Sequence, residues 1–71
     1  MTDTLELELQ IKRAGVTKKS LAKQLGITET ALFNKIKNAS EFKASEIATL
    51  AFALGMTSEQ RDAIFFGQKC E

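Results

Sequence analysis

The stretch from Thr17 to Ile36, TKKSLAKQLGITETALFNKI, places the strongest constraint on how this chain can fold. Apolar or small residues recur in it at helical spacing: Leu21, Ala22, Leu25, Leu32 and Ile36. Gly26 can end a first helix because it adopts the left-handed backbone conformation without a Cβ penalty. Thr28 can begin a second helix, since its hydroxyl can accept from an unpaired backbone N–H. The stretch therefore predicts two short helices joined by a tight turn.

Two details favour a close crossing of these helices. Ala22 is small, and Ile27 can pack on Leu32 as a hydrophobic staple that fixes the angle of the second helix. A helix-turn-helix unit that binds DNA requires such a crossing. An ordinary antiparallel helix pair in a small bundle fits the same spacing, so the spacing alone leaves both interpretations open.

The length of 71 residues allows one domain with one modest core. We therefore predict a single domain over residues 1–71, with the helix-turn-helix unit at about 17–37. The chain has no histidine, and its one cysteine, Cys70, lies next to the C-terminus. One cysteine cannot form an internal disulfide, and no histidine is present to complete a metal site. We expect an incidental thiol, no metal ion and no cofactor.

Other classes of protein are disfavoured by composition. No apolar run is long enough to span a bilayer, and the acidic start, MTDTLELEL, is unlike a signal peptide. We therefore expect a soluble, cytoplasmic protein. There is no glycine-rich phosphate loop, and the carboxylates are scattered over predicted solvent-facing positions. We expect no catalytic residues and no enzyme activity.

The net charge is only +1, but the charges are segregated along the chain. The first eleven residues carry three acids and no base, whereas residues 12–43 carry eight bases against two acids. The positive charge therefore falls on the predicted helix-turn-helix unit and its flanks. Such a distribution is typical of a phosphate-binding surface. A solvated, lysine-rich surface is the alternative interpretation.

A first helix is predicted from Thr4 to Ala14. Asp3 and Glu6 match a capping box before it, and Gly15 can end it. The alternating sequence LELEL would also suit a strand. We nevertheless predict a helix, because the segment is rich in helix formers and no second strand is evident.

This first helix has two apolar sides. Leu7, Ile11 and Ala14 share one face, whereas Leu5 and Leu9 fall well away from it. One interpretation is that both sides are buried. The other is that Leu5 and Leu9 form a contact patch for a partner protein.

Two further helices are predicted after a polar loop at residues 37–41. One runs from about Ala44 to Leu54 and ends at Gly55; the other follows Thr57 to about Phe66, with Gly67 as its stop. The expected fold is therefore all-α, with five short helices around one core. The predicted core residues are Leu7, Ile11, Val16, Leu21, Ala22, Leu25, Ile27, Leu32, Ile36, Phe42, Ile47, Leu50, Ala51, Leu54, Ile64 and Phe65.

A set of short motifs covers nearly the whole chain: Gly15-Val16-Thr17, Leu21-Ala22, Leu25-Gly26-Ile27, Leu32, Lys35-Ile36, Phe42, Ser45-Glu46-Ile47, Ala51, Leu54 and Ile64-Phe65-Phe66. Together these motifs resemble the Cro/repressor helix-turn-helix family of temperate phages. The chain is most similar to the small Cro-like or antirepressor (modulator of repression) proteins of Gram-positive phages. The resemblance implies a compact five-helix, lambda repressor-like domain that acts in a bacterial host cell.

The resemblance also implies a function in a lysis–lysogeny switch. The chain would oppose a partner repressor by binding operator DNA, the repressor itself, or both. The second helix of the unit would lie in the major groove, and its exposed residues would contact bases or a partner: Thr28, Glu29, Thr30, Phe33, Asn34 and Lys37. Five lysines would contact phosphates: Lys18, Lys19, Lys23, Lys35 and Lys43.

Some residues depart from the family pattern and suggest alternatives. A carboxylate such as Glu29 is repelled by phosphates unless it accepts from a cytosine amino group. An exposed aromatic such as Phe33 is common at protein hot spots. An antirepressor that binds only the DNA-reading surface of the repressor is therefore an alternative. An antitoxin or plasmid regulator of the same fold is another.

Two more expectations follow. Lys43 stands where an N-capping threonine is usual, so the helix at residues 44–54 should start more weakly by about 1 kcal/mol. A homodimer is also compatible with the sequence, and either Phe66 or the Leu5/Leu9 pair could serve as its contact.

Overall fold

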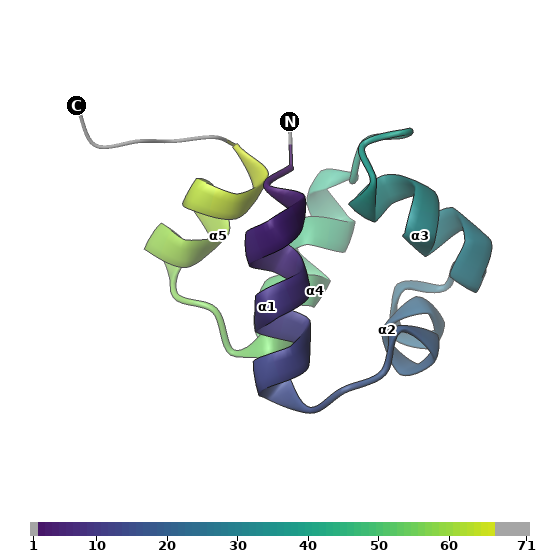
Figure 1. Ribbon diagram of the computed structural model, residues 1–71, viewed down its shortest axis with the longest axis horizontal. Helices are drawn as coiled ribbons and strands as arrows, with labels where there is room; N and C mark the ends of the chain where they lie inside the picture. The colour runs from purple at the N-terminus through teal and green to yellow at the C-terminus, as the bar shows by residue number, and fades with distance from the viewer. Residues whose placement is uncertain (1, 67–71) are drawn as a thin grey trace.

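The computed structural model describes residues 2–66, and five α-helices occupy most of that range (Figure 1). Their bounds are Thr4–Ala14 (α1), Lys18–Leu25 (α2), Glu29–Ile36 (α3), Ala44–Leu54 (α4) and Ser58–Phe65 (α5). No strand occurs in the described range. The all-α, five-helix prediction is confirmed, including the choice of helix for LELEL. The predicted stop at Gly67 and the thiol of Cys70 lie outside the described residues.

Polar side chains set the starts of the helices. Four of them accept a hydrogen bond from the backbone N–H three residues later: Asp3, Thr17, Thr28 and Thr57. The start of α4 differs, because the Lys43 side chain cannot accept such a bond. Instead the Glu46 carboxylate accepts from the Lys43 N–H at 2.8 Å. Half of a capping box is therefore present at the start of α4.

Residues in the left-handed conformation follow four of the helices. Glycines at positions 15, 26 and 55 follow α1, α2 and α4. Asn38 takes this place after α3, with φ of +67°, and no other non-glycine residue in the described range has a positive φ. The Ala39 N–H then donates to the Asn34 carbonyl at 2.8 Å, which completes a Schellman-type end.

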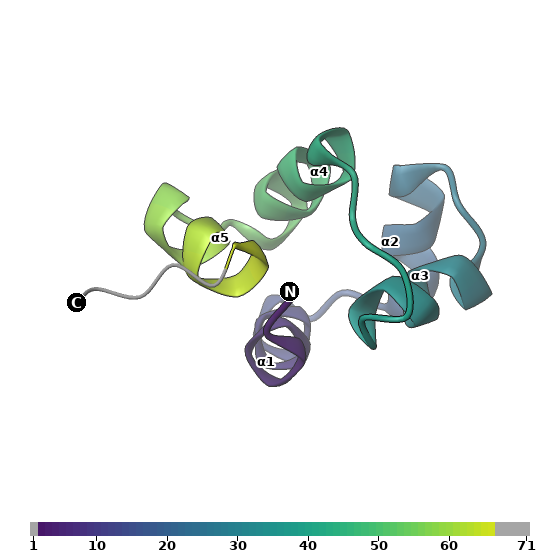
Figure 2. The same ribbon diagram turned by 90° about the horizontal axis from the view of Figure 1, so that it is seen from above.

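Helix α4 lies at the centre of the packing. It contacts α1, α2 and α5, whereas α3 packs mainly against α2. Figure 2 shows α5 on one side of α1 and α4, and α2 and α3 on the other. The radius of gyration is 11.1 Å, which is about the value expected for a compact chain of this length. None of the helices in the described range is long and apolar enough to cross a membrane.

The core is built from the apolar sides of all five helices. Its buried residues were all predicted: Leu7, Ile11, Leu21, Ala22, Leu32, Ile36, Ile47, Leu50, Leu54, Ile64 and Phe65. Phe42 packs edge-on against Phe65, with ring centroids 5.3 Å apart. Ala51 is half-buried, while Ala53 and Met56 pack against the core without having been predicted.

The segment before α1 is tied to two distant parts of the chain. The Asn38 side-chain amide bonds both backbone groups of Thr2, donating to the carbonyl at 2.9 Å and accepting from the N–H at 2.8 Å. The Thr4 hydroxyl donates to the Ile36 carbonyl at 2.6 Å. On the other side, the Asp3 N–H donates to the Ile64 carbonyl at 2.7 Å. These bonds fix the start of α1 against the ends of α3 and α5.

Candidate nucleic-acid interface

A short, well-bonded turn holds α3 against α2. After Gly26, with φ of +73°, the Ile27 N–H donates to the Ala22 carbonyl at 3.0 Å. The Thr28 hydroxyl then accepts from the Ala31 N–H at 3.0 Å and starts α3. Ala22 is only 2% exposed, so its small side chain lies in the core. The turn and the helix cap together fix the direction of α3.

Most of the outer side of α3 carries the residues that were predicted to bind bases or a partner. Leu32 and Ile36 point into the core. The exposed side consists of Thr28, Glu29, Thr30, Phe33 and Lys37, with Asn34 half-buried beside them. We call these six residues the α3 face.

An aromatic residue and a lysine pair on the α3 face. Phe33 is 48% exposed, and the Lys37 ammonium lies 4.6 Å from the centroid of its ring. This distance is within the range of a cation–π interaction. Both residues remain exposed at the surface.

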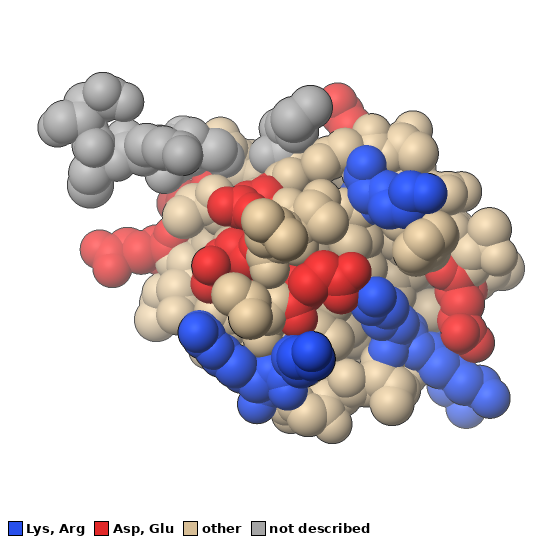
Figure 3. Space-filling model, viewed as in Figure 1, with Lys and Arg blue, Asp and Glu red and all other residues tan. Residues whose placement is uncertain are grey.

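Three of the predicted phosphate-contacting lysines are freely exposed: Lys19, Lys23 and Lys43. None of the three forms an ion pair within residues 2–66. Lys18 is partly occupied, because its ammonium lies 3.0 Å from the Glu8 carboxylate of α1. Figure 3 shows basic side chains over α2, part of α3 and the end of α1. Acidic side chains lie over the earlier part of α1 and toward α5, and some also lie over the start of α3.

Lys35 differs from the other four lysines in its surroundings. Its side chain is 12% exposed, and its ammonium lies 3.1 Å from the Glu46 carboxylate. It also donates to the Glu41 carbonyl at 3.0 Å. Lys35 lies on the side of α3 that faces the start of α4, so its charge is used inside the protein. The Lys35 charge is therefore less accessible to a phosphate than the charges of the exposed lysines.

Glu46, the partner of Lys35, has a lowered pKa. Burial would raise the pKa of the Glu46 carboxyl, but hydrogen bonds from the Lys43 N–H and the Lys35 ammonium outweigh burial and hold that pKa below its usual value. Glu46 is therefore ionised at neutral pH and acts as a structural anion between α3 and α4.

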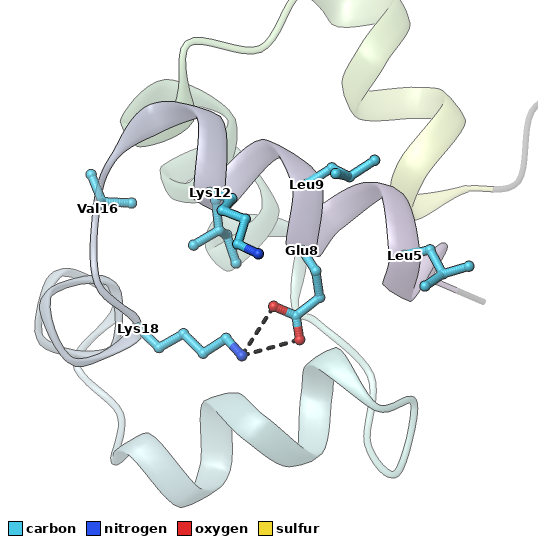
Figure 4. A pocket seen from close by; sticks show the side chains of 7 residues that line it. Leu5, Glu8, Leu9, Lys12, Val16 and Lys18 are labelled. Atoms are coloured by element: carbon cyan, nitrogen blue, oxygen red, sulfur yellow. Dashed lines mark hydrogen bonds and ion pairs between the residues drawn. The ribbon is translucent and has the colours of Figure 1, made fainter.

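Leu5 and Leu9 lie on the surface of α1, as one of the two interpretations of that helix proposed. They are 80% and 43% exposed. Beside them is an open groove of about 520 Å³, lined by Leu5, Glu8, Leu9, Ile11, Lys12, Val16 and Lys18. Figure 4 shows Glu8 and Lys18 pointing toward each other across it, from α1 and α2. Lys18 also lines a small hollow with Glu29, Thr30 and Phe33, so the groove adjoins the α3 face.

Two notable residues were missed by sequence reasoning. Asn38 was treated as part of a polar loop, although asparagine is the non-glycine residue best suited to a left-handed position. Phe52 is 89% exposed on α4. Its position two residues after Leu50 turns it away from the core, and helical spacing alone would have identified it.

No group of three or more histidine, cysteine or acidic side chains suited to a metal ion occurs among the described residues. No protein-family model, curated protein or solved structure matches the chain.

Proposed function

We propose that the chain is a helix-turn-helix transcriptional regulator of the phage Cro/repressor type, which places α3 in the major groove of operator DNA. The observation that carries this proposal is the exposed α3 face beside four lysines without an ion pair in the described residues: Lys19, Lys23, Lys37 and Lys43. Lysines around a protruding helix neutralise phosphates on both sides of a groove. In a lysis–lysogeny switch, occupation of the operator would oppose the partner repressor.

The residues of the α3 face have chemistry suited to bases. The Asn34 amide can donate to and accept from adenine, and the methyl group of Thr30 or the ring of Phe33 can contact a thymine methyl group. Glu29 can accept from a cytosine amino group. The lysines contribute no sequence information, but they position the helix and make binding dependent on salt.

A selection experiment tests DNA binding without knowledge of the operator. The full chain is used to select duplexes from a randomised library, and the selected duplex and a scrambled duplex are compared by fluorescence anisotropy. We expect the selected duplex to bind at least tenfold more tightly at physiological salt. Equal affinity for both duplexes across a range of salt concentrations would argue against sequence-specific binding.

A partner repressor is a second candidate target, favoured by Glu29 and Phe33. Glu29 is exposed without an ion pair in residues 2–66, and it shares a hollow with Phe33 and Lys18. An acid beside an aromatic anchor suits the basic DNA-reading surface of a repressor. Binding there would block the repressor from its operator.

The Glu29→Lys variant separates the two targets because the expected effects have opposite signs. On DNA, a new positive charge in the groove should raise affinity for the scrambled duplex, which has no cytosine contact to Glu29 to lose. On a basic repressor surface, the same change should abolish binding. Anisotropy with duplex DNA reports the first effect, and a pull-down with a candidate partner repressor reports the second.

A further inference from the structure

We propose that two copies of this chain associate through their α1 helices, which lie antiparallel about a twofold axis. The contact is formed by Leu5 and Leu9 together with the groove beside them. This association goes beyond the proposed function and does not depend on it, because the α1 surface is argued from its own shape and charge.

The apolar part of the surface is made by two leucines one helical turn apart. Leu5 is 80% exposed and Leu9 is 43% exposed, although both are large apolar residues on a helix whose other side is buried. The adjoining groove of about 520 Å³ includes Ile11 and Val16 in its lining. Figure 4 shows Leu5 at one end of this surface and Val16 at the other. A protruding leucine and an apolar hollow are thus present on the same face.

The charges on α1 identify a second copy as the occupant. Glu6 and Glu8 lie in the first half of the helix, and Lys12 and Arg13 lie in its last turn. Figure 3 shows this division as acidic atoms over the middle of α1 and basic atoms at its lower end. An antiparallel copy places acid opposite base at both ends of the contact, whereas a parallel copy places like charges together.

The spacing of these residues gives the alignment. If Glu8 faces Lys12 of the second copy, the twofold axis passes near residue 10. Leu5 then falls opposite residue 15 of the second copy, at the end of the groove where Val16 lies. By symmetry the second copy inserts its own Leu5 in the same way, as an isologous contact requires. The apolar and the charged contacts therefore agree on one register.

Glu8 is already paired with Lys18 of its own chain, but its side chain is exposed enough to face a second base. Its carboxylate oxygens each lie 3.0 Å from the Lys18 ammonium, and 40% of the side chain is still exposed. A helix of eleven residues is only about 16 Å long. The contact is therefore small, and we expect a weak dimer that forms in the micromolar to millimolar range of concentration.

Sedimentation equilibrium of the full chain between about 1 µM and 1 mM tests the proposal. The apparent mass should rise from that of a monomer toward that of a dimer. The Leu5→Ala/Leu9→Ala double variant should stay monomeric, and circular dichroism should show that it is folded. Phe52→Ala is the matched control, since it removes an even more exposed side chain from α4. A wild-type chain that is monomeric throughout, or a dimer lost only in Phe52→Ala, would overturn the proposal.

Charge exchange tests the antiparallel register. Glu8→Lys gives a chain with two bases at positions 8 and 12, and Lys12→Glu gives one with two acids. Each variant alone should dimerise about tenfold more weakly than the wild type, and their equimolar mixture should recover association. The variant carrying both changes should dimerise with itself, since antiparallel pairing restores opposite charges. If neither the mixture of the two single variants nor the variant with both changes recovers dimerisation, this register is wrong.

Discussion

The ammonium of Lys35 lies 3.1 Å from a carboxylate oxygen of Glu46, and the two side chains are only 12% and 8% exposed. The pair joins the last turn of α3 to the first turn of α4 across the loop between them. Burial of an ion pair is costly unless further hydrogen bonds satisfy both groups. Here the Lys43 N–H bonds the carboxylate and the Glu41 carbonyl accepts from the ammonium. The pair therefore helps to fix α3, and with it the α3 face, against the core.

The acidity of Glu46 predicts a loss of stability in acid. Its pKa in the folded chain is below the usual value of 4.5 because hydrogen bonds from Lys43 and Lys35 outweigh burial. A depressed pKa contributes stability that is present above pH 4.5 and is lost as pH falls through the folded-state pKa. Thermal unfolding between pH 3 and 7 should show this loss.

The Glu46→Gln variant isolates this contribution. It should lower the free energy of unfolding at pH 7 by about 1–3 kcal/mol, because the Lys35 ammonium loses its counter-ion and the hydrogen bonds to position 46 are no longer charge-assisted. It should also flatten the acid limb of the stability profile. Glu59→Gln, at an exposed position in α5, should change neither quantity. If the stability of Glu46→Gln falls with decreasing pH as steeply as that of the wild type, carboxylates other than Glu46 cause the loss of stability in acid.

Asn38 is predicted to stabilise the fold through its side chain as well as its backbone. Asn38→Gly keeps the left-handed conformation but removes the bonds to Thr2, and should cost about 1 kcal/mol. Asn38→Ala should cost about 1 kcal/mol more, since an alanine is strained at positive φ. Urea unfolding followed by circular dichroism measures both. If Asn38→Gly is as stable as the wild type, the hydrogen bonds between the Asn38 side chain and Thr2 contribute nothing to stability.

Two residues of α4 should respond very differently to truncation. Leu50 is 1% exposed and Phe52 is 89% exposed. Leu50→Ala should lower the free energy of unfolding by about 2–5 kcal/mol through loss of burial and creation of a cavity. Phe52→Ala should change it by less than about 0.5 kcal/mol. Chemical denaturation of the two variants in parallel tests the contrast.

Substitution of Lys23 and of Lys35 should have different effects, because Lys23 is predicted to contact DNA whereas Lys35 is paired within the fold. If α3 binds DNA, Lys23→Ala should reduce the slope of log affinity against log salt by about 1. Lys35→Ala should lower folding stability and leave that slope unchanged, because its charge is already paired with Glu46. Arg61→Ala, which removes a charge on α5, is the control. A slope reduced equally by Lys23→Ala and Arg61→Ala would indicate only a general effect of charge.

Asn34 should contribute to base recognition. If it pairs with adenine, Asn34→Ala should weaken binding to the selected duplex by about 1–3 kcal/mol and leave binding to a scrambled duplex unchanged. Fluorescence anisotropy on both duplexes measures the difference. An equal loss on the two duplexes would point to a disturbed α3 rather than a lost base contact.

Local signals explain why the helices were predictable. Capping residues such as Thr17 and Thr28, and left-handed glycines such as Gly26, act within a few residues of the sequence. The apolar stripes then assign the core, because each helix has one face to bury. These signals gave the bounds of α1 and α4 and every fully buried apolar residue.

The missed features depend on contacts between distant residues. Lys35 resembles any surface lysine until the fold brings Glu46 against it. The bridge from Asn38 to Thr2 likewise joins segments that lie far apart in the sequence. No local pattern reports such pairs, so the sequence could not indicate that the Lys35 charge is paired within the fold.

The bond from the Asp3 N–H to the Ile64 carbonyl has a consequence for the order of assembly during translation. α1 leaves the ribosome first, yet its main packing partners are α4 and α5, which leave last. α2, α3 and α4 can pack together before α5 is available to complete the packing surface of α1. In this order α1 would dock onto α4 and α5 after they have formed, and the apolar side chains of Leu7 and Ile11 would stay exposed until then.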